Sequence, residues 1–162
     1  MSVQLEHIMD AINGWQREGQ KVVFTNGVFD ILHAGHVMYL KEAKALGGRL
    51  VVGLNSDKSA RALGKGPERP INPEEDRQAV LEGLRSVDLV IVFGEDTPAE
   101  LIELIQPDIL VKGGDYDPEC TDSSSPLFIV GSTEVKSRGG TVHSIPLLPG
   151  RSTTSIIKKS RT

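Results

Sequence analysis

Short β-branched apolar runs alternate with helical patterns along almost the whole chain, and this alternation limits the possible folds more than any other feature. Five runs are predicted as strands: Lys21–Thr25, Arg49–Leu54, Asp88–Phe93, Asp108–Lys112 and Thr141–Ile145. The first four are nearly continuous apolar stretches, which is typical of parallel strands buried on both faces. Because strand-helix alternation favours right-handed crossovers, we predict an α/β fold with a Rossmann-like, doubly wound, parallel five-stranded sheet.

The segments around these runs are predicted as helices. The expected helices are Leu5–Arg17, His36–Leu46, Pro73–Leu84, Pro98–Ile105, Ile129–Arg138 and Ser152–Lys159. Pro73 and Pro98 support two of the starts, since proline is favoured in the first turn of a helix. In doubly wound sheets, ligands bind beyond the carboxyl ends of the strands, where the strand order reverses. We therefore expect functional residues just after each strand.

Length and charge narrow the class of protein. A chain of 162 residues fits one domain, 1–162, with an N-terminal helix within 1–20 packed on it. The formal net charge of −4 lacks the basic excess of a nucleic-acid-binding face. The first residues offer no secretory signal, and no apolar run approaches the ~20 residues of a membrane helix. We therefore expect a cytoplasmic protein that binds neither nucleic acid nor membrane.

The stretch that directly follows the first predicted strand, residues 26–36 (NGVFDILHAGH), carries the main chemical signal. Gly27 and Gly35 permit close approach of the backbone to a ligand. His33 and His36 straddle the start of the next helix, where unpaired N–H groups and the helix dipole favour an anion. Three residues apart, the two rings can point into one pocket and stabilise charge on a phosphate. Either histidine alone is well explained as a helix cap, but the combination favours a catalytic pair.

Two further segments suggest phosphate binding. Ser152, Thr153 and Thr154 open the last predicted helix, where hydroxyls and amides form a second anion site, although a simple N-cap also explains them. The segment 56–72 is basic and rich in glycine and proline, and we predict that it forms a mobile loop over the site.

These motifs resemble the signature of the cytidylyltransferase-like nucleotidyltransferase superfamily. More narrowly, they resemble the adenylyltransferase domain of heptose 1-phosphate nucleotidyltransferases of bacterial ADP-heptose synthesis. The resemblance covers Leu5 to Lys159 and is carried by FTNGVFDILHAGHV (24–37), VVGLNSD (51–57), RPINPEEDR (69–77), EDTPAELI (95–102), VKGGDY (111–116) and STTSII (152–157). It implies the nucleotidyltransferase type of Rossmann-like fold. It also implies transfer of AMP from ATP to D-glycero-β-D-manno-heptose 1-phosphate, with release of pyrophosphate, for lipopolysaccharide core synthesis.

The resemblance also implies roles for individual residues. His33, His36 and Lys65 would be catalytic, with Lys65 folding over the triphosphate; a solvated surface lysine is the alternative. The nucleotide would contact Thr25, Asn26, Gly27, Val28, Phe29, Gly35, Lys112, Gly114, Asp115, Ser152, Thr153 and Thr154. Weaker candidates for substrate contacts are Asp30, Asn55, Arg69, Arg77, Tyr116 and Arg151. For Arg77 a salt bridge to a neighbouring carboxylate is an equal alternative, and a turn-forming role is an alternative for Asn55 and Asp115.

Two segments depart from the family pattern. Cys120–Phe128 is longer than the compact family loop, which puts the shape of the nearby pocket in doubt, and Arg151 stands where relatives often carry an aromatic or aliphatic residue. Family members are often fused to a sugar kinase, so a chain of this length is expected to be the stand-alone form. The resemblance further suggests a homo-oligomer, a dimer or tetramer.

ATP is expected as a substrate, with Mg²⁺ carried by its triphosphate, because no dedicated metal-ligand cluster is evident. Two rival functions remain. One is a CTP-dependent cytidylyltransferase acting on glycerol 3-phosphate or another phosphoalcohol, and the other is a non-catalytic nucleotide-binding module. A dinucleotide oxidoreductase is disfavoured, since no Gly-x-Gly-x-x-Gly follows the first strand.

Overall fold

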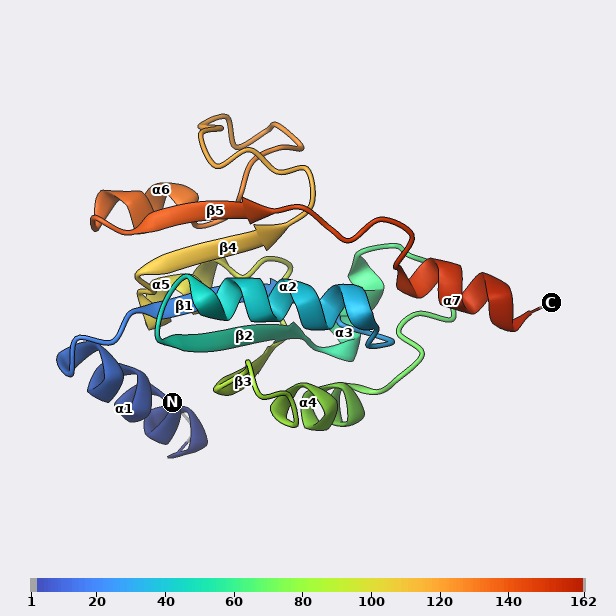
Figure 1. The fold of residues 1–162 in the computed structure, drawn as a ribbon, viewed down its shortest axis with the longest axis horizontal. Coiled ribbons are helices and arrows are strands. Elements are labelled where there is room, and N and C mark those ends of the chain that lie inside the picture. Colours follow the sequence, from blue (N-terminus) through green and yellow to red (C-terminus); the bar gives the residue numbers. More distant parts are fainter. Residues whose placement is uncertain (1–2, 162) are drawn as a thin grey trace.

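Five parallel strands form the centre of the molecule in a computed structural model, which describes residues 3–161 (Figure 1). They are β1 (Val22–Gly27), β2 (Arg49–Asn55), β3 (Leu89–Phe93), β4 (Ile109–Gly113) and β5 (Thr141–Ile145). Their order in the sheet is β3-β2-β1-β4-β5, with every neighbouring pair parallel. The predicted α/β fold with a five-stranded parallel sheet is confirmed, and the strand order reverses between β1 and β4.

Helices precede, connect and follow the strands. They are α1 (Val3–Arg17), α2 (Ala34–Ala45), α3 (Asp57–Ala62), α4 (Glu74–Glu82), α5 (Ala99–Ile105), α6 (Ser132–Ser137) and α7 (Thr153–Ser160). Among these helices of residues 3–161, none combines the length and the apolar character that crossing a membrane requires. The helix predicted within residues 1–20 is α1. Met1 and Ser2, and Thr162 at the other end of the predicted domain, lie outside the described residues.

The short helix α3 was not predicted, because its segment was expected to be a loop. The helix begins after Ser56, whose Oγ accepts a hydrogen bond from the backbone N of Ser59 at 3.1 Å. Buried Asn55 holds the same turn, since its Nδ2 donates to Ser59 Oγ at 2.7 Å. A helix of one and a half turns shows no apolar periodicity in the sequence, so only these capping contacts reveal it.

Alternate residues of the central strands feed two cores, one on each face of the sheet. Val22 and Phe24 of β1 pack with the apolar side chains of α1, α5 and α6. Val23, between them, packs on the opposite face with α2 and with Leu81 of α4. α7 lies off the sheet, beyond the carboxyl ends of the strands (Figure 1). The edge of the sheet at which the strands end is therefore the edge that faces α7 and the start of α2.

Arg77 of α4 is buried and joins segments that are distant in the sequence. Its Nε donates to Asn72 O at 2.9 Å, and its Nη1 donates to Val28 O and to Asn55 O, each at 2.8 Å. Its Nη2 pairs with Asp57 Oδ1 at 2.7 Å, and the side chain has no exposed surface. The structure therefore favours the salt bridge to a neighbouring carboxylate over a contact with a substrate.

Replacing Arg77 by methionine should lower the free energy of unfolding by about 3 kcal/mol or more, because buried acceptors and a carboxylate lose their partner. Urea unfolding followed by circular dichroism measures the change. Arg85→Met is the matched control, since Arg85 is exposed. Equal stabilities of the two variants would contradict the structural role assigned to Arg77.

Candidate active site

A pocket of about 650 Å³ opens at the carboxyl ends of β1 and β4, where the strand order reverses. Its walls come from the turn after β1, the starts of α2 and α7, the segment between α3 and α4, and the end of β4. Most of the predicted site residues line it: Asn26, Gly27, Val28, Phe29, Asp30, His33, Gly35, His36, Lys65, Arg69, Lys112, Tyr116, Arg151, Ser152, Thr153 and Thr154. The pocket thus lies where doubly wound sheets bind their ligands.

His33 caps the amino terminus of α2. Its Nδ1 accepts a hydrogen bond from the backbone N of Gly35 at 3.1 Å. Because a backbone N–H can only donate, Nδ1 is unprotonated, and the proton of the neutral ring is on Nε2. The ring of His33 stacks on that of His36 with a centroid distance of 3.8 Å and an interplanar angle of 22°. The capping role and the predicted catalytic role of His33 are therefore compatible, because the cap uses Nδ1 and leaves Nε2–H to donate to a ligand.

His36 lies deeper in the same pocket. Burial lowers its pKa, and the neighbouring His33 and Lys65 lower it further, to about 4. Its Nδ1 is buried and has no hydrogen-bond partner within the described residues. Buried polar atoms are normally paired in native proteins, so a ring nitrogen left unpaired beside a pocket is a candidate for contact with a ligand. In the free protein at neutral pH, His36 is an uncharged hydrogen-bonding group.

Gly35 allows the two helix starts to meet. A Cβ at this position would lie 2.8 Å from Cε1 of His33 and 3.2 Å from Cβ of Arg151. Glycine is needed there for the histidine cap and for the approach of the segment before α7. Burial of His33, and then the charge of Arg151, lower the pKa of His33. Arg151 is exposed at the pocket and adds positive charge to it.

Phe29 has a left-handed backbone, with φ at 46°, which is uncommon for a residue with a side chain. Its ring meets the ring of His36 edge-on, at a centroid distance of 5.3 Å. A Cβ at Gly27 would lie only 2.9 Å from Cε2 of that ring. The sequence predicted that glycine at 27 admits a ligand, and the structure shows that it also makes room for the aromatic ring that packs on His36.

The three hydroxyl residues at the start of α7 have different partners. Ser152 is the N-cap, and its Oγ accepts from Ser155 N at 3.1 Å. Thr153 is buried, and its Oγ1 donates to Ile31 O at 3.3 Å, which ties α7 to the turn before α2. Thr154 is exposed at the pocket, and its hydroxyl makes no hydrogen bond to other residues in 3–161. The helix start is held to the turn while Thr154 and the backbone amides face the pocket.

Asp30 anchors the segment that precedes α4. Its oxygens accept hydrogen bonds from Arg69 Nε at 2.7 Å and from the backbone N atoms of Ile71 and Asn72 at 2.9 Å. The Asp30 side chain is 1% exposed and that of Arg69 12%. Although Asp30 touches the pocket wall, its carboxylate is occupied by the protein. A direct substrate contact is therefore better assigned to Arg69, whose Nη groups are not used by Asp30.

Lys65 lies on the exposed part of this segment, beyond the Asp30 contacts. It is flanked by Gly64 and Gly66, with φ values of 67° and 117°. Glycines in such conformations can change their backbone angles at low cost. Glu68 of the same segment pairs with Arg161, which directly follows α7, at 2.9 Å. The position of Lys65 at the pocket rim suits a residue that moves onto a bound ligand.

Lys112 lies at the end of β4. Its Nζ donates to Asn26 Oδ1 at 3.3 Å and lies 5.5 Å from the centroid of the Tyr116 ring. Burial lowers the pKa of Lys112, and the charge of Lys65 contributes, to about 8. The pocket thus holds a partly buried lysine next to a neutral amide.

Comparison with known proteins identifies the kind of molecule that has this pocket. Residues 24–159 match the family described as cytidylyltransferase-like. The chain belongs to this family of nucleotidyltransferases. The family resemblance inferred from the motifs is therefore confirmed.

Individual relatives agree with the family. The chain is 50% identical over 155 residues to the bifunctional protein HldE of Methylobacillus flagellatus, covering 96% of this chain and 30% of the relative. It is 56% identical over 145 residues to HldE of Wolinella succinogenes, covering 90% and 28%. The chain thus spans about 30% of the length of these curated relatives.

A solved structure supports the same relationship. The lipopolysaccharide core biosynthesis protein of Thermoplasma volcanium GSS1 matches with a TM-score of 0.60 and 34% identity, covering 80% of this chain and 98% of that chain.

Five predicted site residues of this cytidylyltransferase-like chain do not line the pocket: Thr25, Asn55, Arg77, Gly114 and Asp115. The hydroxyl of Thr25 is buried against Tyr39 Oη at 2.6 Å. Gly114 forms the turn after β4, with φ at 109° and its N bonded to Ile145 O at 2.9 Å. Asp115 follows this turn and is exposed.

Sequence reasoning missed three residues of the pocket wall, Tyr39, Leu147 and Leu148, whereas Gly113, which also lines it, belongs to the VKGGDY motif (111–116). Tyr39 follows His36 by three residues on α2, so helical spacing could have revealed it. Burial raises the pKa of Tyr39, and its phenol therefore stays protonated. The two leucines follow Pro146 just after β5, and an apolar side chain gives no chemical signal for a site in the sequence.

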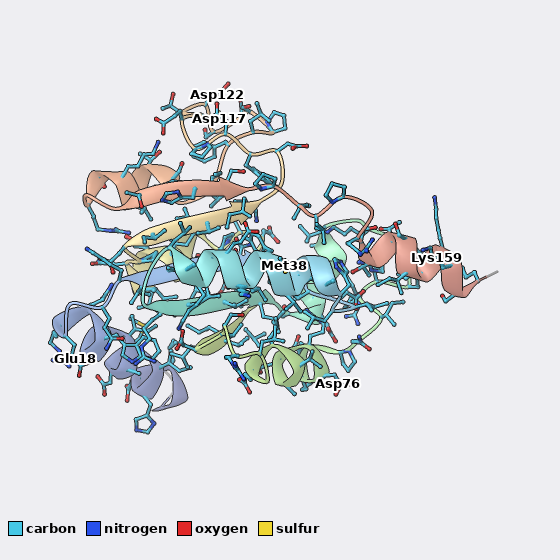
Figure 2. All side chains as sticks on the ribbon, viewed as in Figure 1. Glu18, Met38, Asp76, Asp117, Asp122 and Lys159 are labelled. Atoms are coloured by element: carbon cyan, nitrogen blue, oxygen red, sulfur yellow. The ribbon has the colours of Figure 1, made fainter. Side chains whose placement is uncertain are left out.

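The longer loop Cys120–Phe128 contributes nothing to the pocket wall. It projects beyond β5, far from α7, as the labels of Asp117, Asp122 and Lys159 show in Figure 2. The extra length in this part of the chain therefore supplies no lining residue to the pocket.

The charges of the pocket favour an anion. Lys65, Arg69, Lys112 and Arg151 line it, and the one lining carboxylate in the described chain, Asp30, is occupied by hydrogen bonds. Within residues 3–161 there is no group of three or more His, Cys, Asp or Glu side chains arranged to hold a metal ion. Cations and amide dipoles around a cleft attract phosphate groups.

His36 should titrate near pH 4, well below the ~6.5 of an unperturbed histidine. Lys65→Met should raise this pKa, because it removes one of the charges that disfavour the imidazolium. A bound nucleoside triphosphate should raise it further, because an anion favours the charged ring. NMR titration of the ring resonances measures all three values. A midpoint near 6.5 in the free protein would contradict the burial of His36.

Proposed function

We propose that the chain transfers the AMP moiety of ATP to a sugar 1-phosphate, D-glycero-β-D-manno-heptose 1-phosphate, and releases pyrophosphate. The observation that carries the proposal is the meeting of the starts of α2 and α7, with His33 and His36, in one pocket at the reversal of strand order. The likeness to a lipopolysaccharide core biosynthesis protein and the motif resemblance to heptose 1-phosphate nucleotidyltransferases support heptose as the sugar.

The proposed chemistry is an in-line displacement. A phosphate oxygen of the sugar 1-phosphate attacks the α-phosphorus of ATP, and the bond from that phosphorus to the bridging oxygen of the leaving pyrophosphate breaks. The attacking phosphate is already anionic at neutral pH, so no general base is needed. Reactions of this kind depend on positioning and on stabilisation of charge. A pocket made of donors and cations, with its carboxylate occupied, is suited to that task.

Individual groups would divide this work. The Nε2–H of His33 and the ring of His36 would donate to the reacting phosphate, together with the backbone amides at the starts of α2 and α7. Lys65 would close over the β- and γ-phosphates from its glycine-flanked segment. Mg²⁺ would arrive on the triphosphate as part of the substrate, which fits a pocket that offers cations and hydroxyls to the phosphates.

A matrix of substrates tests the proposal. Pyrophosphate release is measured with ATP, CTP, GTP and UTP, each combined with heptose 1-phosphate, glucose 1-phosphate and glycerol 3-phosphate. ATP with heptose 1-phosphate should give the highest kcat/KM. A preference for CTP with glycerol 3-phosphate would favour the cytidylyltransferase alternative. Nucleotide binding without pyrophosphate release from any acceptor would favour the non-catalytic module and overturn the proposal.

His36→Ala should lower the turnover number by on the order of 10²-fold or more, as expected for loss of a preorganised donor to the transition state. The same pyrophosphate assay measures it. His7→Ala is the matched control, because His7 is exposed on α1 and does not line the pocket. Near wild-type turnover in a folded His36→Ala protein would remove this residue from the mechanism.

Three expectations accompany the proposal and stay predictions: residues 1–162 acting as one nucleotidyltransferase domain, a cytoplasmic location, and a dimer or tetramer. Sedimentation at several protein concentrations measures the assembly state.

A further inference from the structure

Lys112 lies on the β4 side of the pocket, apart from the helix starts that hold His33 and Thr154. β4 pairs with β1 at the reversal of strand order, so Lys112 and Asn26 stand near the ends of adjacent strands. Neighbouring Gly113 is closely packed, because a Cβ there would lie 3.1 Å from both Leu147 Cδ2 and Tyr39 Cε2. On this side of the pocket the lysine therefore has the amide of Asn26, aromatic rings and apolar side chains around it.

The charge of Lys112 is not balanced by the protein. Its Nζ faces the neutral amide of Asn26 and the ring of Tyr116, and no carboxylate in the described part of the chain forms an ion pair with it. Burial, and then the charge of Lys65, lower the pKa of Lys112, because both disfavour the charged form. A partly buried cation next to neutral groups is stabilised when an anion binds beside it.

The proposed reaction brings two anions together. The triphosphate has its own donors at the starts of α2 and α7, while the phosphate of the acceptor must lie against the α-phosphorus. Two phosphates at that distance repel each other unless a cation offsets the second one. If the β4 side held the sugar and base of the nucleotide instead, the charge of Lys112 would stay unbalanced, because both groups are uncharged.

We infer that Lys112 binds the phosphate group of the acceptor, and that the β4 side of the pocket is the subsite for the sugar phosphate. This inference rests on the proposed function. It differs from the resemblance, which places Lys112 and the turn after β4 against the nucleotide. The two assignments predict different effects on the two substrates.

Lys112→Met separates the two assignments. In initial-rate measurements with both substrates varied, the KM for the sugar 1-phosphate should rise on the order of 10- to 100-fold, the loss expected for a hydrogen bond between charged groups. The KM for ATP should change little. Lys41→Met is the matched control, because Lys41 is exposed on α2 and does not line the pocket. Lys112→Arg keeps a cation at the site and should preserve part of the acceptor binding if the methionine variant does not fold.

The outcomes distinguish this inference from the proposed function. Absence of pyrophosphate release by the wild-type protein would overturn the proposed function. Wild-type activity with an unchanged KM for the sugar 1-phosphate in Lys112→Met would overturn the inference alone. A rise in the KM for ATP, alone or by the same factor as for the acceptor, would assign Lys112 to the nucleotide and also overturn the inference.

The pH dependence gives a second readout. Only the charged ammonium pairs with phosphate, so the KM for the acceptor should rise as the pH passes upward through about 8. The acceptor is already a dianion there, since its second pKa is about 6. Lys112→Arg should remove this inflection, because arginine stays protonated. The titratable groups that act on Lys112 are Lys65, whose charge lowers its pKa, and Tyr116, whose ring centroid lies 5.5 Å from its Nζ, and the variant leaves both in place. An inflection that persists in Lys112→Arg would contradict the inference.

Discussion

The pocket depends on how the turn after β1 is held, because that turn leads from the sheet to the two stacked histidines. Asp30 binds it to the segment before α4 through the guanidinium of Arg69 and two backbone N–H groups. Arg77 donates one hydrogen bond to the carbonyl of Val28 in the same turn and another to the carbonyl of Asn55 at the end of β2. These groups are buried, so water cannot replace a lost partner. The turn and the segment before α4 therefore form one supporting structure, and Lys65 lies outside it on the exposed side.

Burial and like charge act together within the pocket. His36 and Lys112 both have a pKa lowered mainly by burial, and Lys65 lowers both further. The free protein thus holds several groups whose charged forms are disfavoured until an anion arrives. Binding of phosphates would reverse this balance, since each anion stabilises the imidazolium and the ammonium. Burial of these two groups thus makes their charged forms depend on an anion beside them.

The fold was largely predictable because its signals are local. Each predicted strand is present with ends that differ by at most two residues, since apolar β-branched runs bounded by polar residues mark buried parallel strands well. Helix ends were less predictable. α6 begins three residues later than expected, after Gly131, whose φ of 86° is accompanied by a close approach to Ile102. α3 depends on capping by Ser56 and on a contact from Asn55, which no periodic pattern reveals.

The sequence likewise predicts some features of the candidate site and not others. The sequence by itself determined which motifs follow the strands and open the helices, and hence that His33, His36 and Thr154 would gather at one edge of the sheet. Only the tertiary structure decided which polar side chains serve the protein instead of the pocket, such as Asn55 and Arg77. The reason is physical: spacing along a strand or helix sets the direction of a side chain, whereas its partners come from segments distant in sequence that only the packed fold brings within hydrogen-bonding distance.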